Sequence, residues 1–398
     1  TKKFTLIVMA VSLLVTAFLF GLPALRFQTY NQEGVIKGLE GIAYEKEQAA
    51  EYSVPLTNEY ITEAIREVQQ LFENPDNVGY DGNEQFLIED AYWDSIAPRE
   101  NLLNMIAKNY ADPNESVGYN ELPEVDISSG TDFYGARQEK IEKLLNASAR
   151  EMSEEQEAYW KNMNSKVDKP FRYGYYAGWE IIISSFELIM FAFLAVCIVI
   201  APVFSGEYQA GTDAVILSAK YGKTKLTTAK IIASYLFGVL AFTLHVVVAL
   251  GLPLIAFGFE GWDLPLQIAN TTIPYPLTFL QAALVNLGVV YLVLFAMIGL
   301  TLLLSAKMKS PYLVLIVLVP VLFIPLFLSP NGTTGAYNLT LFLLPYRSAM
   351  PEIGKYISYQ FGGIILDAFT MRAILYAVLT AVMLPLAGLG FKKHQVSA

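Results

Sequence analysis

Six long apolar runs alternate with more polar segments along the chain. The first, residues 4–25, holds 22 residues without a charge. A helix rises about 1.5 Å per residue, so a run of this length can cross a hydrocarbon core of about 30 Å. The other runs occupy residues 181–204, 231–259, 277–305, 312–328 and 373–391. The pattern therefore predicts a polytopic membrane protein of the α class with a six-helix transmembrane bundle.

The first apolar run has a second interpretation. Lys2 and Lys3, followed by an apolar stretch, are also typical of a secretory signal peptide that is cleaved from the mature protein. The run is long for such a signal, however, and no convincing cleavage site with small residues follows it. We therefore expect residues 1–25 to form the first transmembrane helix.

Residues 26–175 follow a different pattern, because apolar positions there recur at helical spacing between charged ones. Three such stretches cover residues 61–72, 102–110 and 133–145, and the capping-box sequence from Ser153 to Gln156 predicts the start of another helix. Strand-like alternation is scarce. We expect residues 26–175 to form a mainly α-helical extracytoplasmic domain, and residues 176–398 to hold transmembrane helices 2–6 with a hairpin near residues 204–230.

Charge divides the chain along the same boundaries and predicts its orientation. Residues 26–175 hold 29 of the 37 acidic and 14 of the 27 basic residues, a net of −15, whereas the remainder is net +5. Lysines gather at residues 2–3, 220–230, 307–309 and 392–393, and residues 260–276 contain neither Lys nor Arg. Because Lys and Arg concentrate in cytoplasmic loops, we expect both termini in the cytoplasm and the acidic domain outside.

Several classes of function are disfavoured by the residues present. The single cysteine, Cys197, excludes an internal disulfide and a cysteine metal cluster, and His245 and His394 are too far apart for a zinc motif. An acidic domain disfavours nucleic acid as a partner. Gly222-Lys223-Thr224 is similar to the end of a phosphate-binding loop, but Leu217 stands where that loop needs glycine. We expect no enzyme, no metal site and no cofactor on this chain.

The segment after the second run carries the most informative motif. Its residues are Glu207, Gly211-Thr212, Ile216-Leu217, Lys223 and Lys230. In order and spacing they resemble the permeases of type-2 ABC exporters, in the bacterial subset with a large extracellular domain between the first two transmembrane helices. The usual Pro-x-Ser-Arg turn of that family is replaced here by residues 219–223.

This resemblance implies a permease subunit of an ATP-driven exporter in the bacterial cytoplasmic membrane. A second permease copy or a paralogue would complete the translocation pathway, and a separate ABC ATPase subunit would bind ATP and Mg²⁺. Residues 208–219 can form a short amphipathic helix at the inner membrane surface, which the resemblance identifies as the coupling helix. The expected ATPase-coupling residues are Glu207, Tyr208, Gly211, Thr212, Ile216, Leu217, Lys223 and Lys230.

Polar residues within the apolar runs are candidates for the translocation pathway, because burial in a bilayer is costly. They are Glu180, Glu187, His245 and Asn286. Glu180 and Glu187 share one helix face; we expect Glu180 at the membrane interface, whereas Glu187, about two turns deeper, could contact a cationic or amphipathic peptide substrate. The competing interpretation is structural, since Glu187, His245 and Asn286 could each hydrogen-bond a neighbouring helix. Residues 339–350 and 353–369 are too short or too polar to cross, and we expect outer interfacial or re-entrant helices there.

A second function remains open beside export. The outer domain could sense a peptide or a cell-wall component and signal through an ABC ATPase without transport. ATP turnover that responds to a ligand, with no movement of that ligand, would distinguish this sensor from an exporter.

Overall fold

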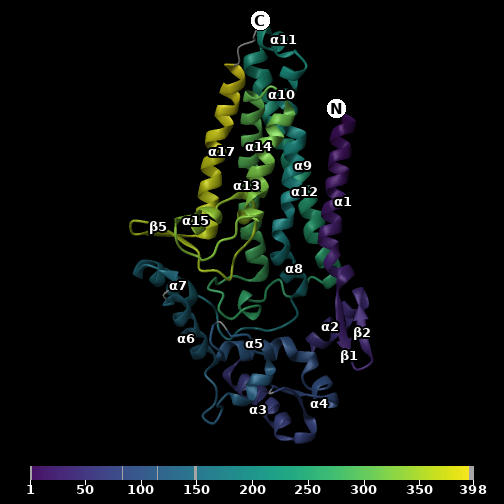
Figure 1. The fold of residues 1–398 in the computed structure, drawn as a ribbon, viewed down its shortest axis with the longest axis vertical. Helices are drawn as coiled ribbons and strands as arrows, with labels where there is room; N and C mark the ends of the chain where they lie inside the picture. The colour runs from purple at the N-terminus through teal and green to yellow at the C-terminus, as the bar shows by residue number, and fades with distance from the viewer. Residues whose placement is uncertain (1, 83, 114, 148–149, 394–398) are drawn as a thin grey trace.

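The computed structural model describes residues 2–82, 84–113, 115–147 and 150–393. A tall helical bundle stands on a smaller, mainly helical domain, and α1 begins at the same end of the bundle as α17 ends (Figure 1). The smaller domain, residues 27–176, is called the inserted domain below because it lies between α1 and α8. The described chain therefore confirms a polytopic α-helical architecture.

The bundle helices follow the apolar runs. They are α1 (Lys2–Arg26), α8 (Ala177–Ser185), α9 (Met190–Ile200), α10 (Pro202–Gln209), α12 (Thr227–Phe257), α13 (Phe279–Lys307), α14 (Pro311–Phe323) and α17 (Ala368–Lys392). Among the described residues, five continuous helical segments are long and apolar enough to cross a membrane: Lys3–Arg26, Ala177–Gln209, Gly222–Phe257, Phe279–Lys307 and Ala368–Lys392.

The sixth expected span is shorter than the apolar run that predicts it. The helical segment covers Pro311–Leu326, and α14 gives way to a 3-10 turn at Ile324–Leu326. Pro320 lies inside α14 and Pro325 lies in the turn, so two backbone N–H donors are missing where the helix would have to continue. Pro320 and Pro325 are apolar and so extend the apolar run, but they limit the length of the helix.

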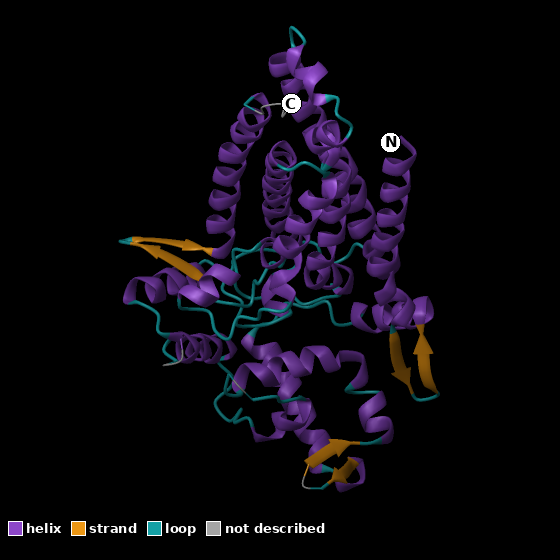
Figure 2. Cartoon of the chain, turned by 45° about the horizontal axis from the view of Figure 1, so that its top comes forward, coloured by secondary structure: helices purple, strands orange, loops and turns teal. Residues whose placement is uncertain are grey.

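The inserted domain consists of short helices and two small hairpins (Figure 2). Its elements are β1 (Gln28–Asn31), β2 (Gly34–Lys37), α2 (Gly38–Ala50), α3 (Asn58–Glu73), β3 (Val78–Asp81), β4 (Glu84–Leu87), α4 (Glu89–Trp93), α5 (Glu100–Tyr110), α6 (Phe133–Leu145) and α7 (Glu154–Ser165). Helices occupy all the stretches with helical periodicity. Ser153 and Gln156 form the expected capping box at the start of α7.

The inserted domain packs on the loops of the bundle. Arg137 of α6 is fully buried, and its Nε and Nη2 donate to the backbone oxygens of Thr271 and Ile273, at 2.5 and 3.2 Å. Trp160 of α7 packs edge-on against Tyr275 and Tyr356, with ring centroids 5.6 and 5.4 Å apart. Most of the buried apolar residues of the domain and of the bundle belong to one continuous core, and Phe342, Ile357, Tyr359 and Ala368 form a second, smaller cluster.

The segment before α17 differs from the expectation. Residues 353–369 contain an antiparallel hairpin of β5 (Ser358–Phe361) and β6 (Ile364–Asp367), so the prediction of a helix there is wrong. Gly362 and Gly363 form a two-residue turn with Gly362 at φ +61°, a conformation that favours a hairpin over a helix. Residues 339–350 form two short helices, α15 (Ala336–Leu341) and α16 (Pro345–Ala349), because Pro345 starts a new helix.

Candidate functional site

The hairpin between α10 and α12 projects beyond the bundle at the end where α1 begins and α17 ends (Figures 1 and 2). It contains α11 (Asp213–Ser218) and a π-helical turn, Gly222–Leu226, that leads into α12. The motif residues from Glu207 to Lys230 therefore lie together at the end of the molecule opposite the inserted domain.

The expected single helix over residues 208–219 is wrong. α10 ends at Gln209, and Gly211 has φ +67°, a left-handed conformation that commonly follows the end of a helix. The chain then restarts as α11, which has only six residues. The hairpin is thus a helix–turn–helix unit rather than one amphipathic helix.

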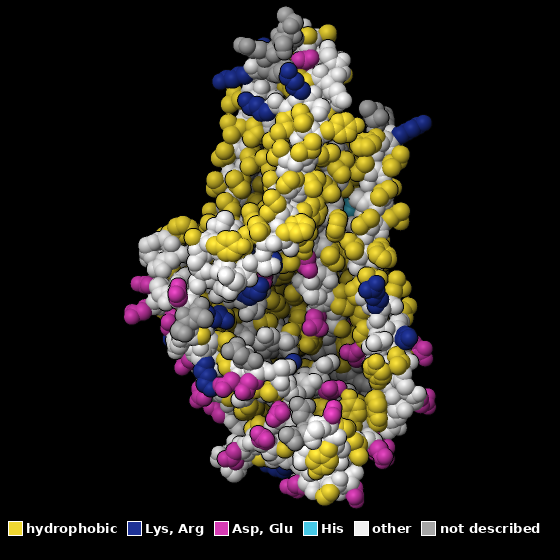
Figure 3. Space-filling view, viewed as in Figure 1, with side chains coloured by type: hydrophobic (Ala, Val, Ile, Leu, Met, Phe, Trp, Pro, Cys, Tyr) yellow, Lys and Arg dark blue, Asp and Glu magenta, His cyan; other side chains and the backbone are white. Residues whose placement is uncertain are grey.

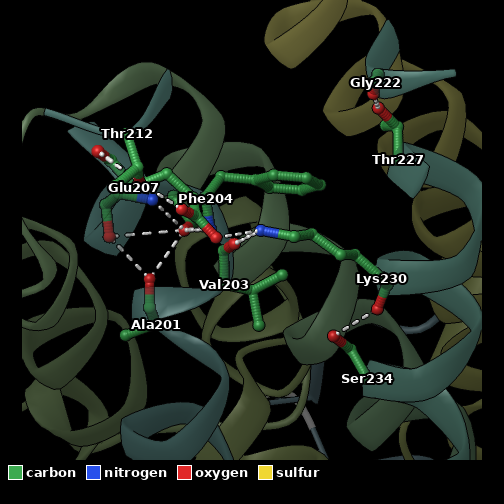
Figure 4. Close-up of polar contacts among 11 residues, drawn as sticks. Ala201, Val203, Phe204, Glu207, Thr212, Gly222, Thr227, Lys230 and Ser234 are labelled. Atoms are coloured by element: carbon green, nitrogen blue, oxygen red, sulfur yellow. Dashed lines mark hydrogen bonds and ion pairs between the residues drawn. The ribbon is translucent and has the colours of Figure 1, made fainter. Parts of the chain in front are cut away.

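An ion pair closes the base of the hairpin (Figure 4). The Nζ atom of Lys230, on α12, lies 2.5 Å from Oε1 of Glu207, on α10, and also donates to the backbone oxygen of Val203 at 2.9 Å. Thr212 donates its hydroxyl to the other carboxylate oxygen of Glu207 at 2.5 Å. The Lys230 and Glu207 side chains are 19% and 26% exposed, so water screens the pair only partly. Three elements are therefore tied together at one carboxylate.

The base of α10 is joined to α13 by a buried serine. Pro202 starts α10, and Ser305 of α13 accepts hydrogen bonds from the backbone N–H groups of Phe204 and Ser205 at 3.0 and 2.9 Å. The Ser305 hydroxyl also donates to the backbone oxygen of Ala201 at 2.6 Å. A side chain of α13 thus satisfies backbone groups at the junction of α9 and α10, where the ladder of the helix is interrupted.

Aromatic rings form the floor under the ion pair. Phe204 of α10 stacks on Phe391 of α17 with centroids 4.5 Å apart, and Tyr208 stacks on the same ring at 5.9 Å. The Tyr208 hydroxyl donates to the backbone oxygen of Ala306 at 3.1 Å. Tyr208 therefore connects the hairpin to α13 and α17 instead of facing outward.

The turn before α12 packs so tightly that only glycine fits. A Cβ atom added at Gly222 would lie 1.6 Å from the backbone oxygen of Ile216. Thr227 fixes the same turn by donating its hydroxyl to the Gly222 oxygen at 3.0 Å, and Leu217 is buried beside it. Gly222-Lys223-Thr224 accordingly lies in a helical turn and follows no strand, unlike a phosphate-binding loop.

Beyond this turn the hairpin exposes an apolar and basic surface. Val215 is 72% exposed and Tyr221 is 48% exposed. The Nζ atoms of Lys220 and Lys225 lie 5.4 and 4.7 Å from the centroid of the Tyr221 ring, and Lys223 is exposed nearby. We call Val215, Lys220, Tyr221, Lys223 and Lys225 the hairpin tip. Val215 and Tyr221 are absent from the predicted coupling set, although an aromatic residue inside a lysine run was a visible signal.

The predicted coupling residues therefore divide into three groups. Glu207, Thr212 and Lys230 meet in one polar cluster. Tyr208, Gly211 and Leu217 shape or anchor the backbone, and Ile216 is half-buried. Lys223 alone lies on the exposed tip.

The candidate pathway residues are not brought together at one site. His245 is buried, with Nε2 2.8 Å from the Ser12 hydroxyl and Nδ1 2.7 Å from the Ala241 oxygen. Asn286 is buried and donates to the Ala349 oxygen at 3.0 Å. Both make the interhelical or helix–loop contacts of the structural interpretation. Glu187 lies in a 3-10 turn, Phe186–Ile189, between α8 and α9, and Glu180 borders a cavity at the inserted domain.

Metal ligands do not cluster in the part of the chain that the structure describes. No group of three or more His, Cys, Asp or Glu side chains there could hold a metal ion, and Cys197 is buried. His394 lies outside the described residues.

Comparison with known proteins supplies the family. No curated protein and no solved structure matches the chain. The sequence model of the family described as ABC-2 family transporter protein matches residues 2–396, which is nearly the whole chain. The chain is therefore a multi-pass membrane protein of the ABC-2 transporter family, a permease subunit whose family implies an ABC ATPase as its partner.

Proposed function

We propose that this permease works in an ATP-driven exporter and couples to its ATPase through the hairpin tip. The observation that carries the proposal is that Val215 and Tyr221 are both exposed, with Lys220 and Lys225 over the Tyr221 ring, on a segment that projects from the bundle. Protein interfaces are enriched in aromatic residues, and an exposed aromatic ring can serve as an anchor for a partner. The basic charge of this end supports its placement in the cytoplasm, where the ATPase binds ATP and Mg²⁺.

The contacts below the tip support transmission of movement. A force on the tip passes to α10 and α12 through Glu207 and Lys230, and to α13 and α17 through Tyr208, whose ring stacks on Phe391. These contacts are hydrogen bonds and packed rings within a rigid helical scaffold, so the tip cannot tilt without displacing the bundle helices. The pathway itself would form between this chain and a second copy or a paralogous permease.

The inserted domain would then face the outside of the cell. Its charge of −15 across residues 26–175 would attract cationic compounds over long distances. This charge supports export of a cationic or amphipathic substrate, such as a peptide.

The test is ATP-dependent movement in a reconstituted complex. The chain is purified together with the ABC ATPase encoded beside it and incorporated into vesicles. We expect substrate movement that requires ATP and stops when the ATPase carries a substitution that abolishes hydrolysis. Failure of the chain to bind an ABC ATPase contradicts the proposal. ATP turnover stimulated by a peptide or a cell-wall component, without movement of that ligand, favours the sensing function instead.

A further inference from the structure

A cavity of about 340 Å³ lies where the inserted domain meets the bundle. Its walls come from α2, from residues 97–101, and from residues 173–177 with the first turn of α8. Figure 3 shows this junction hollowed on one face, with acidic side chains in and around the hollow. The cavity therefore lies beside the outer ends of the bundle helices.

The charges around the cavity are unbalanced. Four charged side chains line it: Glu45, Arg99, Glu100 and Glu180. Arg99 is committed elsewhere, because its Nη1 lies 2.7 Å from Glu67 and its Nε donates to the Ser95 oxygen at 2.8 Å.

The lysine nearest in sequence to Glu45 is also paired with another carboxylate. Lys46 lies 2.7 Å from Glu260. Within the described residues, Glu45 and Glu180 form neither an ion pair nor a hydrogen bond with any side chain. Two carboxylates thus face one cavity without a protein cation to balance them.

Tyrosines complete the walls, and Tyr173 is the most deeply buried of them. Tyr44, Tyr52, Tyr173, Tyr175 and Tyr176 all line the cavity. Tyr173 is only 7% exposed, yet its hydroxyl makes no hydrogen bond to any residue that the structure describes. Tyr173, Glu45 and Glu180 line the same cavity, and burial together with the charges of Glu180 and Glu45 raises the pKa of the phenol. This deeply buried side chain thus brings an unpartnered hydroxyl to the cavity, where it can donate to a polar group of a bound ligand.

We propose that this cavity binds an organic cation with an amine or quaternary ammonium head, held between Glu45 and Glu180 and faced by the tyrosine rings. Carboxylates neutralise the charge, and tyrosine faces attract a cation through the negative side of the ring. Tyr173 supplies a hydroxyl for a polar group beside the cationic head. That the cation is the exported cargo rests on the proposed function, whereas its binding does not.

A neighbouring cavity indicates at which end of the site the cationic head binds. It has a volume of about 410 Å³ and shares Asn101, Tyr176 and Glu180 with the first. Its remaining charged lining includes Lys108, Lys140 and Arg150, with Glu115 as the only other carboxylate among its described lining residues. Basic side chains repel a cationic head, so the head belongs at the Glu45 end and a neutral or anionic part could extend toward the second cavity.

The experiment compares choline with its uncharged isostere 3,3-dimethyl-1-butanol. Isothermal titration of the purified full-length chain measures the affinity for each compound. We expect choline to bind at least about tenfold more tightly, because only the charge differs between the two. Equal affinity for both compounds overturns the proposal, and this comparison requires no altered protein.

Two variants of the cavity carboxylates then test whether choline binds in this cavity. Glu45→Gln and Glu180→Gln keep the size and polarity of each side chain, and each should weaken choline binding by about tenfold. Glu47→Gln is the matched control, because Glu47 is exposed on the same helix and does not line the cavity; its affinity should be unchanged. Choline affinity unchanged in both folded cavity variants places the cation elsewhere and overturns the proposal.

These measurements test the cation site and the proposed export function separately. Choline binding that depends on Glu45 and Glu180, without ATP-driven movement of any cation, would retain the cation site and refute export. ATP-driven export with no charge-dependent choline binding would retain the proposed function and refute the site.

Discussion

The Nζ atom of Lys230 lies 2.5 Å from Oε1 of Glu207, although 23 residues separate them in the chain. This contact closes the base of the hairpin, and Thr212 strengthens it by donating to the second carboxylate oxygen. Because the pair joins α10 to α12, it fixes the angle at which the tip leaves the bundle. In the coupling that we propose, this pair positions the tip.

The first prediction concerns this ion pair. Glu207→Ala leaves the Lys230 ammonium with the Val203 oxygen and the Phe204 and Phe391 rings, and removes the carboxylate that accepts from Thr212. Both partners are partly exposed, so the free energy of unfolding should fall by only about 1 kcal/mol. We expect normal membrane insertion but loss of the link between ATP turnover and transport, measured as molecules moved per ATP hydrolysed in vesicles.

Lys230→Ala should have the same effect, whereas the double exchange of Glu207→Lys with Lys230→Glu should recover part of the coupling. Recovery would be partial because a glutamate at position 230 cannot donate to Val203. Loss of membrane insertion in Glu207→Ala would show instead that the pair is needed for folding.

The second prediction concerns the hairpin tip. Val215→Ala and Tyr221→Ala remove exposed side chains, so thermal stability should be unchanged while affinity for the ATPase falls by about tenfold each. Surface plasmon resonance on nanodisc-embedded chain measures this affinity. Lys309→Ala is the control, since Lys309 is exposed at the same end of the bundle but outside the hairpin. An ATPase that binds both tip variants with full affinity would contradict docking at this surface.

The third prediction tests the tight turn before α12. Gly222→Ala brings a Cβ atom to 1.6 Å from the Ile216 oxygen, so the backbone must shift at a cost of about 1–3 kcal/mol. We expect a distorted hairpin, seen as faster amide hydrogen exchange over residues 213–226, and weaker coupling. Gly251→Ala serves as the comparison, because its Cβ would meet nothing within 4 Å. Identical exchange in the two variants would show that the turn adapts freely.

The fourth prediction concerns the buried arginine between the inserted domain and the bundle. Arg137→Met keeps the apolar stem of the side chain but leaves the oxygens of Thr271 and Ile273 without their donors. Loss of two buried hydrogen bonds from a charged donor should lower the unfolding free energy by about 2–4 kcal/mol. Thermal unfolding in detergent measures the change. Arg66→Met should be nearly neutral, because Arg66 is 44% exposed and pairs within its own helix; equal losses in both variants would exclude a special role for Arg137.

Local signals in the sequence predicted much of the fold. The capping box at Ser153 and Gln156 forms because its two hydrogen bonds join residues three apart, which any helix brings together. The hairpin of β5 and β6 was expected to be helical, although β5 alternates polar Ser358 and Gln360 with aromatic Tyr359 and Phe361, which is the pattern of a strand. There the turn residues Gly362 and Gly363 were the better evidence.

The sites depend on contacts that no local pattern contains. Glu207 and Lys230 were both expected to matter, but their direct pairing requires α10 and α12 to stand side by side. Glu180 was a candidate for the pathway, whereas Glu45 was missed altogether. Glu45 lies in the middle of α2, where a half-buried carboxylate has the same sequence pattern as a solvated one, and only the fold brings it to the cavity that Glu180 also lines.

The last prediction follows from the raised pKa of Glu45. Burial and then the negative charge of Glu180 hold this pKa above its ordinary value of 4.5. The folded protein thus binds this proton more tightly than the unfolded chain, so the group stabilises the fold below pH 4.5, and that contribution fades as pH rises through the raised pKa. A bound cation favours the ionised carboxylate, and choline affinity should therefore rise with pH over the same interval.

The groups that face Glu45 make this assignment specific. Glu180 is the carboxylate whose charge helps to raise the pKa of Glu45. Tyr173, Tyr175 and Tyr176 stay neutral, because their pKa values are raised. Arg99 and Lys46 form ion pairs with Glu67 and Glu260. Titration of choline at a series of pH values from 4 to 8 measures the midpoint, and Glu45→Gln should shift or abolish it while Glu47→Gln leaves it in place. A choline affinity independent of pH across this range would exclude Glu45 as a ligand of the cation.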